Sequence, residues 1–338
     1  MPLSTEMTVA VKEATAILRR GGLVAFPTET VYGLGADAEN PNAVARIFAA
    51  KGRPANHPVI VHIGHIDLLE HWATDIPPSA WLLAKHFWPG PLTLILKRDA
   101  HVLDAVTGGQ DTVGLRMPDH PVALALLSAF GSGVAAPSAN RYGRISPTTA
   151  QHVRDELGEA VDCILDGGPC RVGIESTILD LSGAHPQVLR PGAISAAAIK
   201  NILGRDVANV SGVAASRAAP RVPGALLSHY APQTPLVLVA PDGLQDEVKR
   251  HLEKGERVAV LARSIAKPLT SCVWQIMPSD ASDYAHELYA RLRALDALHV
   301  DHLLIEALPA EPVWQAVRDR LARAAQAQPD RSKGNADE

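Results

Sequence analysis

The chain has 338 residues, of which 47% are hydrophobic and 20% charged, a balance that is typical of globular proteins and excludes a disordered or fibrous chain. The length predicts two domains. A formal charge of −4 excludes a global basic field for binding nucleic acid, although a local basic patch stays open.

Short apolar strands alternate with helices through the first 200 residues. The first helix is expected over residues 9–20, where apolar side chains recur at helical spacing and Gly21-Gly22 follow. Further helices are expected over residues 41–51, 68–72, 81–88, 121–130, 149–157 and 196–203. Strands are expected over residues 23–26, 58–63, 92–96, 113–115, 134–136, 163–165 and 178–181. This order predicts an α/β fold, and the close spacing between residues 92 and 115 permits antiparallel pairing, so we expect a mixed sheet.

The composition changes after residue 208. Residues 211–223 are rich in Ala, Ser, Pro and Arg without periodicity, which predicts a linker. A second series has strands expected over residues 236–239, 258–261, 273–277 and 303–305, and helices over 244–252, 285–298 and 313–325. It predicts a small, mostly parallel, Rossmann-like α/β domain. We therefore divide the chain into a first domain (1–208), a linker or lid (209–234), a second domain (235–326) and a disordered tail (327–338).

Cysteine usage and hydropathy indicate the compartment. The three cysteines, Cys163, Cys170 and Cys272, form no C-x-x-C pair, which favours reduced thiols over a disulfide framework or a zinc site. The start lacks an apolar stretch behind basic residues, and no apolar run reaches membrane-spanning length. We expect a soluble, cytoplasmic protein.

Common site signatures are absent. The chain has no G-x-x-x-x-G-K-[ST] loop, no G-x-G-x-x-G after a strand and no G-x-S-x-G elbow. His57, His62, His65 and His71 cross a strand and a helix without H-E-x-x-H or an acidic ligand nearby at metal spacing. Isolated histidines are the better interpretation, and we predict no metal site.

Lys51 and Arg53 lie where a helix ends and a strand is about to begin. The helix dipole alone favours cations there, but Gly52 permits a bend that would aim both at an anionic ligand, so both interpretations stay open. Ser138 and Asn140 directly follow a buried strand. They could point at one ligand or form an ordinary turn.

The segment 27–35 gathers two hydroxyls, a carboxylate and a phenol after a hydrophobic strand, followed by two glycines. Such a stretch suits recognition of a small polar zwitterion, with a tight turn as the alternative. Residues 112–116, 173–178 and 189–192 also pair short strands with polar groups. The linker end, 229–232, could fold back over a site or dock onto its own surface.

Six segments occur in one order: PTETVYGLGADA from Pro27, KGRP from Lys51, APSAN from Ala136, ESTILDL from Glu175, LRPG from Leu189 and PGALLSHYAP from Pro223. Together they resemble the long form of the L-threonylcarbamoyladenylate synthases, over residues 10–325. The resemblance implies a YrdC-type catalytic domain, with a mixed twisted sheet and flanking helices, plus a smaller C-terminal domain.

The resemblance implies a nucleotidyltransferase that uses L-threonine, bicarbonate or CO2, and ATP accompanied by Mg2+. The products are threonylcarbamoyl-AMP and pyrophosphate, and the former serves threonylcarbamoyladenosine modification of tRNA. Transient contact with threonylcarbamoyl transferase proteins is implied. Neither a membrane nor stable nucleic-acid binding is expected.

The resemblance also implies site residues. Catalytic roles fall on Lys51, Arg53, Ser138 and Asn140. ATP binding falls on Arg53, His57, Thr112, Ser138, Ser146, Arg190 and Tyr230, with His57 standing where the family commonly has Asn. Threonine binding falls on Thr30, Tyr32, His62, Arg116 and Ser176. The match of Tyr230 suggests that the linker, residues 223–232, closes over bound substrates.

The implied chemistry agrees with these residue types, because holding anions together requires cations and not a nucleophilic triad. Two alternative functions are possible. A carbamoyltransferase of hydrogenase maturation would be longer and carry C-x-x-C pairs. A non-catalytic RNA-binding module is opposed by the acidic net charge and by the retained K-x-R and S-x-N residues.

Overall fold

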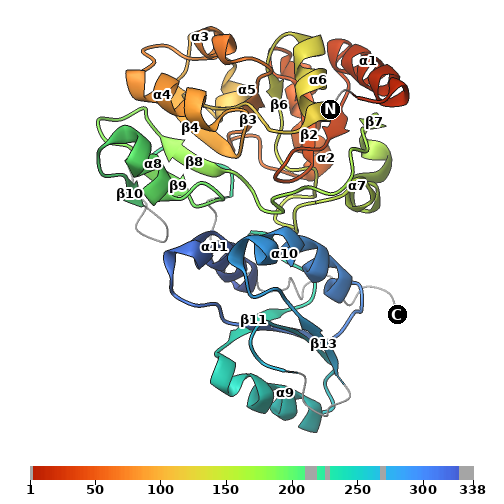
Figure 1. The fold of residues 1–338 in the computed structure, drawn as a ribbon. Helices are drawn as coiled ribbons and strands as arrows, with labels where there is room; N and C mark the ends of the chain where they lie inside the picture. Colours follow the sequence, from red (N-terminus) through yellow and green to blue (C-terminus); the bar gives the residue numbers. More distant parts are fainter. Residues whose placement is uncertain (1–2, 210–218, 225–228, 267–271, 327–338) are drawn as a thin grey trace. The chain divides into compact units, whose positions relative to one another are not determined.

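The computed structural model describes residues 3–209, 219–224, 229–266 and 272–326. The chain forms two compact units (Figure 1). The first unit comprises Met1–Tyr142 and Ser146–Ala225, and the second comprises Gly143–Ile145 and Leu226–Glu338. Of the predicted linker and tail, residues 210–218, 225–228 and 327–338 lie outside the described residues.

The first unit contains a large mixed sheet, as the sequence predicts. Its strands are β1 (Val24–Phe26), β2 (Gly33–Asp37), β3 (Ile60–His62), β4 (Leu92–Lys97), β5 (Thr112–Arg116), β6 (Val134–Ala135), β7 (Cys163–Ile164), β8 (Thr177–Asp180), β9 (Gln187–Arg190) and β10 (Ala208–Asn209). Within the described ranges their order is β10-β9-β8-β4-β5-β3-β6-β2-β1-β7. The pair β4–β5 is antiparallel, whereas β3–β5 and β4–β8 are parallel.

Eight α-helices are described in the first unit. They are α1 (Thr5–Arg19), α2 (Pro41–Lys51), α3 (Leu69–Trp72), α4 (Pro78–Phe87), α5 (Asp104–Thr107), α6 (Pro121–Phe130), α7 (Ala150–Leu157) and α8 (Ala196–Leu203). The boundaries of α2 show which local interactions begin and end a helix. Asn40 accepts hydrogen bonds from the backbone N–H groups of Asn42 and Ala43, and Gly52 ends the helix at φ 60°.

Different helices cover the two faces of this sheet. Side chains alternate along a strand, so Val113 and Leu115 of β5 face the main core beneath α2, α3, α4 and α8. On the opposite face, α1 and α6 cover β1 and β6. We call the rest of that face the open face. Its apolar floor is formed by Ile60, Ile95, Ile178 and Leu189.

Residues 219–224 lie over the open face. Val222 packs against its apolar floor. The backbone N–H of Arg221 donates to Gln110 Oε1 at 2.6 Å, and its guanidinium donates to the carbonyl of Gly108 at 2.7 Å. The carbonyl of Pro223 accepts from Arg190 Nη1 at 2.9 Å. Residues 219–224 of the linker are therefore fastened to the first unit.

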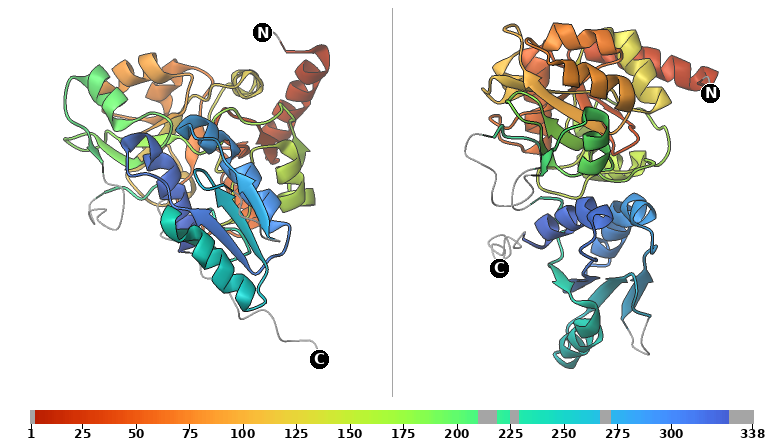
Figure 2. Two further views of the ribbon diagram at one scale, coloured as in Figure 1. Left: turned by 60° about the horizontal axis from the view of Figure 1, so that its bottom comes forward. Right: turned by 60° about the vertical axis from the view of Figure 1, so that its left-hand side comes forward.

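The second unit is an all-parallel sheet covered by helices, which confirms the predicted mostly parallel domain. Its elements are β11 (Leu236–Val239), α9 (Leu244–Glu253), β12 (Val258–Ala262), β13 (Val273–Ile276), α10 (Ala281–Asp296), β14 (His302–Glu306) and α11 (Gln315–Ala325). The strand order is β11-β14-β12-β13. Helix α9 covers one face, and α10 and α11 cover the other (Figures 1 and 2).

Strand β2 is the main element that the sequence interpretation missed. Gly33 and Gly35 give it little β propensity, so the sequence predicts no strand in this segment. Gly35 is required by packing, because a Cβ at this position would lie 2.8 Å from both Phe26 and Val134. All three cysteines are free, as expected. Across the described residues, no helix is long and apolar enough to cross a membrane.

Candidate active site

The open face carries polar side chains at both ends of β5. Thr112, Gly114 and Arg116 share this face by alternation, and the parallel pairing sets His62 of β3 beside Arg116. Gly114, between Thr112 and Arg116, has no side chain to cover the apolar floor. A Cβ at this position would lie 3.1 Å from Ile95 Cδ1. At the rise of an extended strand, Thr112 and Arg116 stand roughly 13 Å apart. The face therefore offers two polar ends joined by an apolar floor.

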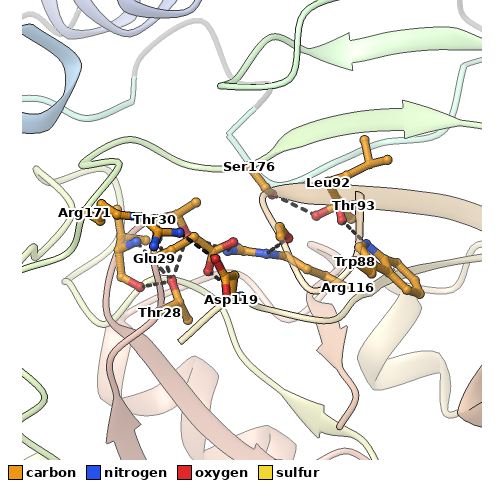
Figure 3. A network of polar contacts seen from close by, with 12 residues as sticks. Thr28, Glu29, Thr30, Trp88, Leu92, Thr93, Arg116, Asp119, Arg171 and Ser176 are labelled. Carbon is orange, nitrogen blue, oxygen red and sulfur yellow. Dashed lines mark hydrogen bonds and ion pairs between the residues drawn. The ribbon is translucent and has the colours of Figure 1, made fainter. Parts of the chain in front are cut away.

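Arg116 is the centre of one polar end (Figure 3). Its side chain is 4% exposed and forms an ion pair with Glu29 Oε1 at 2.8 Å. The same Nη2 donates to Thr30 Oγ1 at 2.8 Å, and Nε donates to the carbonyl of Gly90 at 3.4 Å. Glu29 Oε2 accepts from the backbone N–H of Asp119 at 3.0 Å. These contacts fix the orientation of a buried guanidinium, the group best suited to bind a carboxylate.

The turn after β1 brings Thr30 to Arg116. Thr28 Oγ1 lies 2.8 Å from Thr30 Oγ1 and donates to the carbonyl of Val31 at 2.7 Å, which folds the turn. Tyr32 points elsewhere: its hydroxyl donates to the carbonyl of Gly168 at 2.8 Å. The structure thus joins Thr30 to Arg116, and joins the Tyr32 hydroxyl to the backbone of a different loop.

Ser176 and Arg190 meet beside the start of β4. Ser176 Oγ lies 2.8 Å from Thr93 Oγ1 (Figure 3) and accepts from Arg190 Nη2 at 3.0 Å. Arg190 Nε also donates to the carbonyl of Ser176 at 3.0 Å. Ser146 joins the same region, because its hydroxyl donates to Glu175 Oε1 at 2.5 Å. Three of the predicted site residues are therefore brought together from distant segments.

His62 is a buried, neutral imidazole at the same end. Burial, followed by the charge of Arg116, lowers the pKa of His62 from 6.5 to about 3. Its ring meets Phe26 edge-on, with ring centroids 6.0 Å apart. Among the described residues, Nδ1 has no hydrogen-bond partner. A buried polar atom without a partner next to a guanidinium is a candidate contact for a polar ligand.

The lowered pKa of His62 predicts a pH-dependent stability. Between pH 6.5 and 3 the unfolded chain binds a proton that folded His62 does not, so the free energy of unfolding falls as pH falls. The contribution is at most about 1.4 kcal/mol per pH unit. Urea unfolding of wild type and His62→Gln at pH 7, 6 and 5 should show a stability difference that shrinks towards pH 5. Parallel curves would contradict the buried neutral imidazole. His65→Gln is the control, because that side chain is 67% exposed.

Lys51 holds the loop that carries Ser138 and Asn140. It is 3% exposed, and its Nζ donates to the backbone carbonyls of both residues. Burial, followed by the charge of Arg53, lowers the pKa of Lys51 well below its ordinary value. The predicted neighbourhood of Lys51, Ser138 and Asn140 is present, and it is built through the main chain of the loop.

Arg53 lies beside Tyr142 and His57. Its Nη2 donates to the carbonyl of Pro58 at 2.8 Å, and its guanidinium carbon lies 5.8 Å from the centre of the Tyr142 ring. The Tyr142 hydroxyl lies 3.1 Å from His57 Nδ1. Burial, followed by the charges of Arg53 and Arg221, lowers the pKa of His57. Arg53 lies over the Tyr142 ring, Tyr142 contacts His57, and the three side chains form a polar, partly aromatic surface.

Tyr230 belongs to the second unit. There it is buried, stacks on Tyr289 with ring centroids 5.9 Å apart, and lies beneath the guanidinium of Arg320 at 5.1 Å. Its proposed contact with ATP involves residues of the first unit and stays a prediction.

The sequence interpretation assigned no site role to Glu29, Thr93, Tyr142 or Glu175, although these residues hold the predicted ones in place. One signal was available: Thr93 interrupts the apolar strand LTLILK on its open-face side. For Glu29 and Glu175, the available signal was their place inside the segments that carry the family resemblance.

Comparisons with known proteins show the family of the chain. The family model Sua5_yciO_yrdC, described as "Telomere recombination", matches residues 16–192, and the model Sua5_C, described as the C-terminal domain of threonylcarbamoyl-AMP synthase, matches residues 194–326. The chain is 40% identical to a threonylcarbamoyl-AMP synthase of Pyrococcus abyssi, with 93% of each chain covered. It is 42% identical to the threonylcarbamoyl-AMP synthase of Bacillus subtilis, with 93% of this chain and 92% of the relative covered.

A solved structure agrees as well. The crystal structure of P. abyssi Sua5 complexed with L-threonine matches with a TM-score of 0.87 and 39% identity, covering 94% of each chain. A non-catalytic RNA-binding module is accordingly not favoured. Matches of this extent over both units show that the chain belongs to the Sua5 family of threonylcarbamoyl-AMP synthases.

Proposed function

We propose that this protein makes L-threonylcarbamoyl-AMP and pyrophosphate from L-threonine, bicarbonate or CO2, and ATP, for threonylcarbamoyladenosine modification of tRNA. The observation that carries the proposal is the buried guanidinium of Arg116, held by Glu29 and Thr30 beside neutral His62. Such a guanidinium suits an amino-acid carboxylate. The related P. abyssi protein was solved with L-threonine, which supports the same ligand here.

In the proposed threonine subsite, Arg116 binds the carboxylate. Thr30, His62 and Ser176 supply neutral hydrogen-bonding groups for the amine, the hydroxyl or the carbamate. Tyr32 acts as a positioning residue, since its hydroxyl is bonded to Gly168. A neutral His62 adds no positive charge against Arg116 and can accept a hydrogen bond from the ligand.

The proposed reaction needs no protein nucleophile. The threonine nitrogen bonds to the carbon of CO2 and loses a proton, which gives a carbamate. A carbamate oxygen then bonds to the α-phosphorus of ATP while the bond from that phosphorus to the bridging oxygen breaks, and pyrophosphate leaves with that oxygen. Both reactants are anionic, so the chain's contribution is positioning and charge stabilisation, which we assign to Lys51, Arg53 and Arg190.

We propose that ATP lies along the open face. The phosphates meet Lys51, Arg53 and the loop of Ser138 and Asn140. Further ATP contacts are assigned to His57, Thr112, Ser146, Arg190 and Tyr230. The two buried carboxylates nearby, Glu29 and Glu175, already accept hydrogen bonds from Asp119 and Ser146. Mg2+ is therefore proposed to enter with ATP, held mainly by its phosphates.

Residues 219–224 are proposed as the closing part of the linker. Val222→Asp would bury a charge on an apolar floor and so displace the segment. If the segment retains bound ATP, the Val222→Asp variant should show a KM for ATP that is several-fold higher, measured by pyrophosphate release. Val313→Asp is the control, because Val313 is 67% exposed and belongs to the second unit. A fall in the KM for ATP would identify the segment as an obstacle to ATP and contradict the proposal.

Pyrophosphate release tests the function. The protein is incubated with ATP and Mg2+, and threonine or bicarbonate is omitted in turn, with CO2 excluded in the second case. Release should require both. Release that ignores both omissions would point to an ATP pyrophosphatase and remove the synthase proposal.

We further propose a cytoplasmic protein that hands its product to threonylcarbamoyl transferase proteins through transient contacts. The product is a mixed anhydride, which water hydrolyses. Rapid transfer to the next protein therefore reduces the loss of product. Neither membrane attachment nor stable nucleic-acid binding is part of the proposal.

A further inference from the structure

A cluster of two histidines and a carboxylate lies on the surface of the first unit, outside the open face. Glu39 lies in the turn between β2 and α2, His71 lies in α3, and His101 follows β4. One ligand atom from each of the three lies within 4.8 Å of the others. His71 Nε2 and Glu39 Oε1 are 2.9 Å apart. The sequence offered His71 no acidic neighbour at metal spacing; the fold supplies Glu39 and a second imidazole.

Two of these side chains are oriented by outer partners. His101 Nδ1 is hydrogen-bonded to Asp99 Oδ1 at 2.8 Å, which leaves Nε2 for a ligand role. Ser132 Oγ donates to Glu39 Oε2 at 2.9 Å, which leaves Oε1 facing His71. A carboxylate behind one imidazole and a hydroxyl behind the carboxylate form the arrangement that orients ligands in protein metal sites.

The third side chain is anchored by the core. His71 precedes Trp72, which is fully buried, and the His101 ring lies 4.5 Å from the His71 ring and 5.9 Å from the Trp72 ring. Around a tetrahedral Zn2+ with bonds of about 2.0–2.1 Å, neighbouring ligand atoms lie roughly 3.3 Å apart. The distance of 2.9 Å between His71 Nε2 and Glu39 Oε1 is close to that spacing.

We propose that Glu39, His71 and His101 form a three-ligand site for one late first-row divalent cation, with Zn2+ as the reference ion, completed by water. Two imidazoles and one carboxylate favour such ions over Mg2+ or Ca2+, which prefer oxygen ligands. The site joins three segments that are distant in the chain. It lies at the end of β2 opposite to Gly33, the residue that bridges to Ser138, so its effect is on stability and not on the reaction.

A second cluster, in the second unit, is less suited to a cation. His251, Glu256 and His302 also lie within 4.8 Å of one another. However, His251 Nδ1 is bonded to Glu256 and His251 Nε2 is bonded to Glu247 at 3.1 Å, so both ring nitrogens are already engaged by carboxylates. This use of both ring nitrogens argues against a role of His251 as a metal ligand.

Zn2+ titration of the full chain by calorimetry, after chelator treatment and without ATP, tests the site. We expect saturable binding of one Zn2+ per chain. His71→Ala and His101→Ala should each weaken binding at least about tenfold, and Asp99→Asn about tenfold through the lost outer partner. His65→Ala should leave the Kd unchanged, because this exposed histidine lies outside the cluster. Zn2+ should raise the melting temperature of wild type but not of the His71→Ala/His101→Ala double variant.

Three results would overturn the site: wild-type affinity in both single histidine variants, a wild-type Kd weaker than about 100 μM, or binding that is lost in His302→Ala but kept in His71→Ala. All variants should keep wild-type pyrophosphate release. The metal site and the proposed function can therefore fail independently.

Discussion

Arg116→Lys is expected to lower kcat/KM for threonine by about two to three orders of magnitude, while the KM for ATP changes only a few-fold. The lysine keeps a positive charge for Glu29 but cannot reproduce the fork that reaches Glu29, Thr30 and Gly90 together. Arg116→Gln is a poorer test, because an uncompensated buried Glu29 would cost about 3–5 kcal/mol of folding free energy.

The measurement is initial-rate pyrophosphate release with threonine varied at saturating ATP. Arg171→Lys is the matched control: Arg171 pairs with Asp119 in the same network, but its side chain is 72% exposed. This control should stay within about twofold, as surface ion pairs contribute little. An unchanged threonine dependence in Arg116→Lys would remove Arg116 from the threonine subsite.

Arg53→Ala is expected to lower kcat by at least about a hundredfold, the usual scale for losing one preorganised charge at a phosphoryl transfer. The variant loses the hydrogen bond to the Pro58 carbonyl and the contact with the Tyr142 ring, and we expect it to keep the fold.

Single-turnover rates at saturating ATP and threonine separate this loss from weaker binding, and circular dichroism and thermal melting report the fold. Arg46→Ala is the matched control: it lies on α2, carries the same charge and is half-exposed in a pair with Asp162. Arg53→Ala turnover close to that of Arg46→Ala would exclude Arg53 from the site.

Much of the architecture follows from local signals. Helices α6 and α8 have the predicted bounds, and α2 follows from Asn40, Pro41 and Gly52, because caps and periodicity are short-range properties. The antiparallel pair β4–β5 follows from the short connection between the strands. Strand β2 does not, because Gly35 is required by the close approach of Phe26 and Val134, a tertiary requirement that β propensity does not report.

The candidate site shows the same division. The order of the motifs suggests candidate residues, but it does not indicate which other side chains hold them in place. Glu29 meets Arg116 because the turn after β1 is folded by Thr28, and Ser146 meets Glu175 across distant loops. The sequence suggested that Lys51 aims its charge at a ligand. In the structure its Nζ binds the carbonyls of Ser138 and Asn140, so the residue also shapes the loop.

The central claim is that one site joins threonine, a carbamate carbon and AMP. Mass spectrometry of a reaction with ATP, Mg2+, threonine and 13C-bicarbonate tests it most directly. The account predicts a threonylcarbamoyl adenylate that carries one labelled carbon, formed in equal amount with pyrophosphate, and lost in Arg53→Ala. An unlabelled threonyl adenylate, or AMP and pyrophosphate formed without any labelled adenylate, would contradict it.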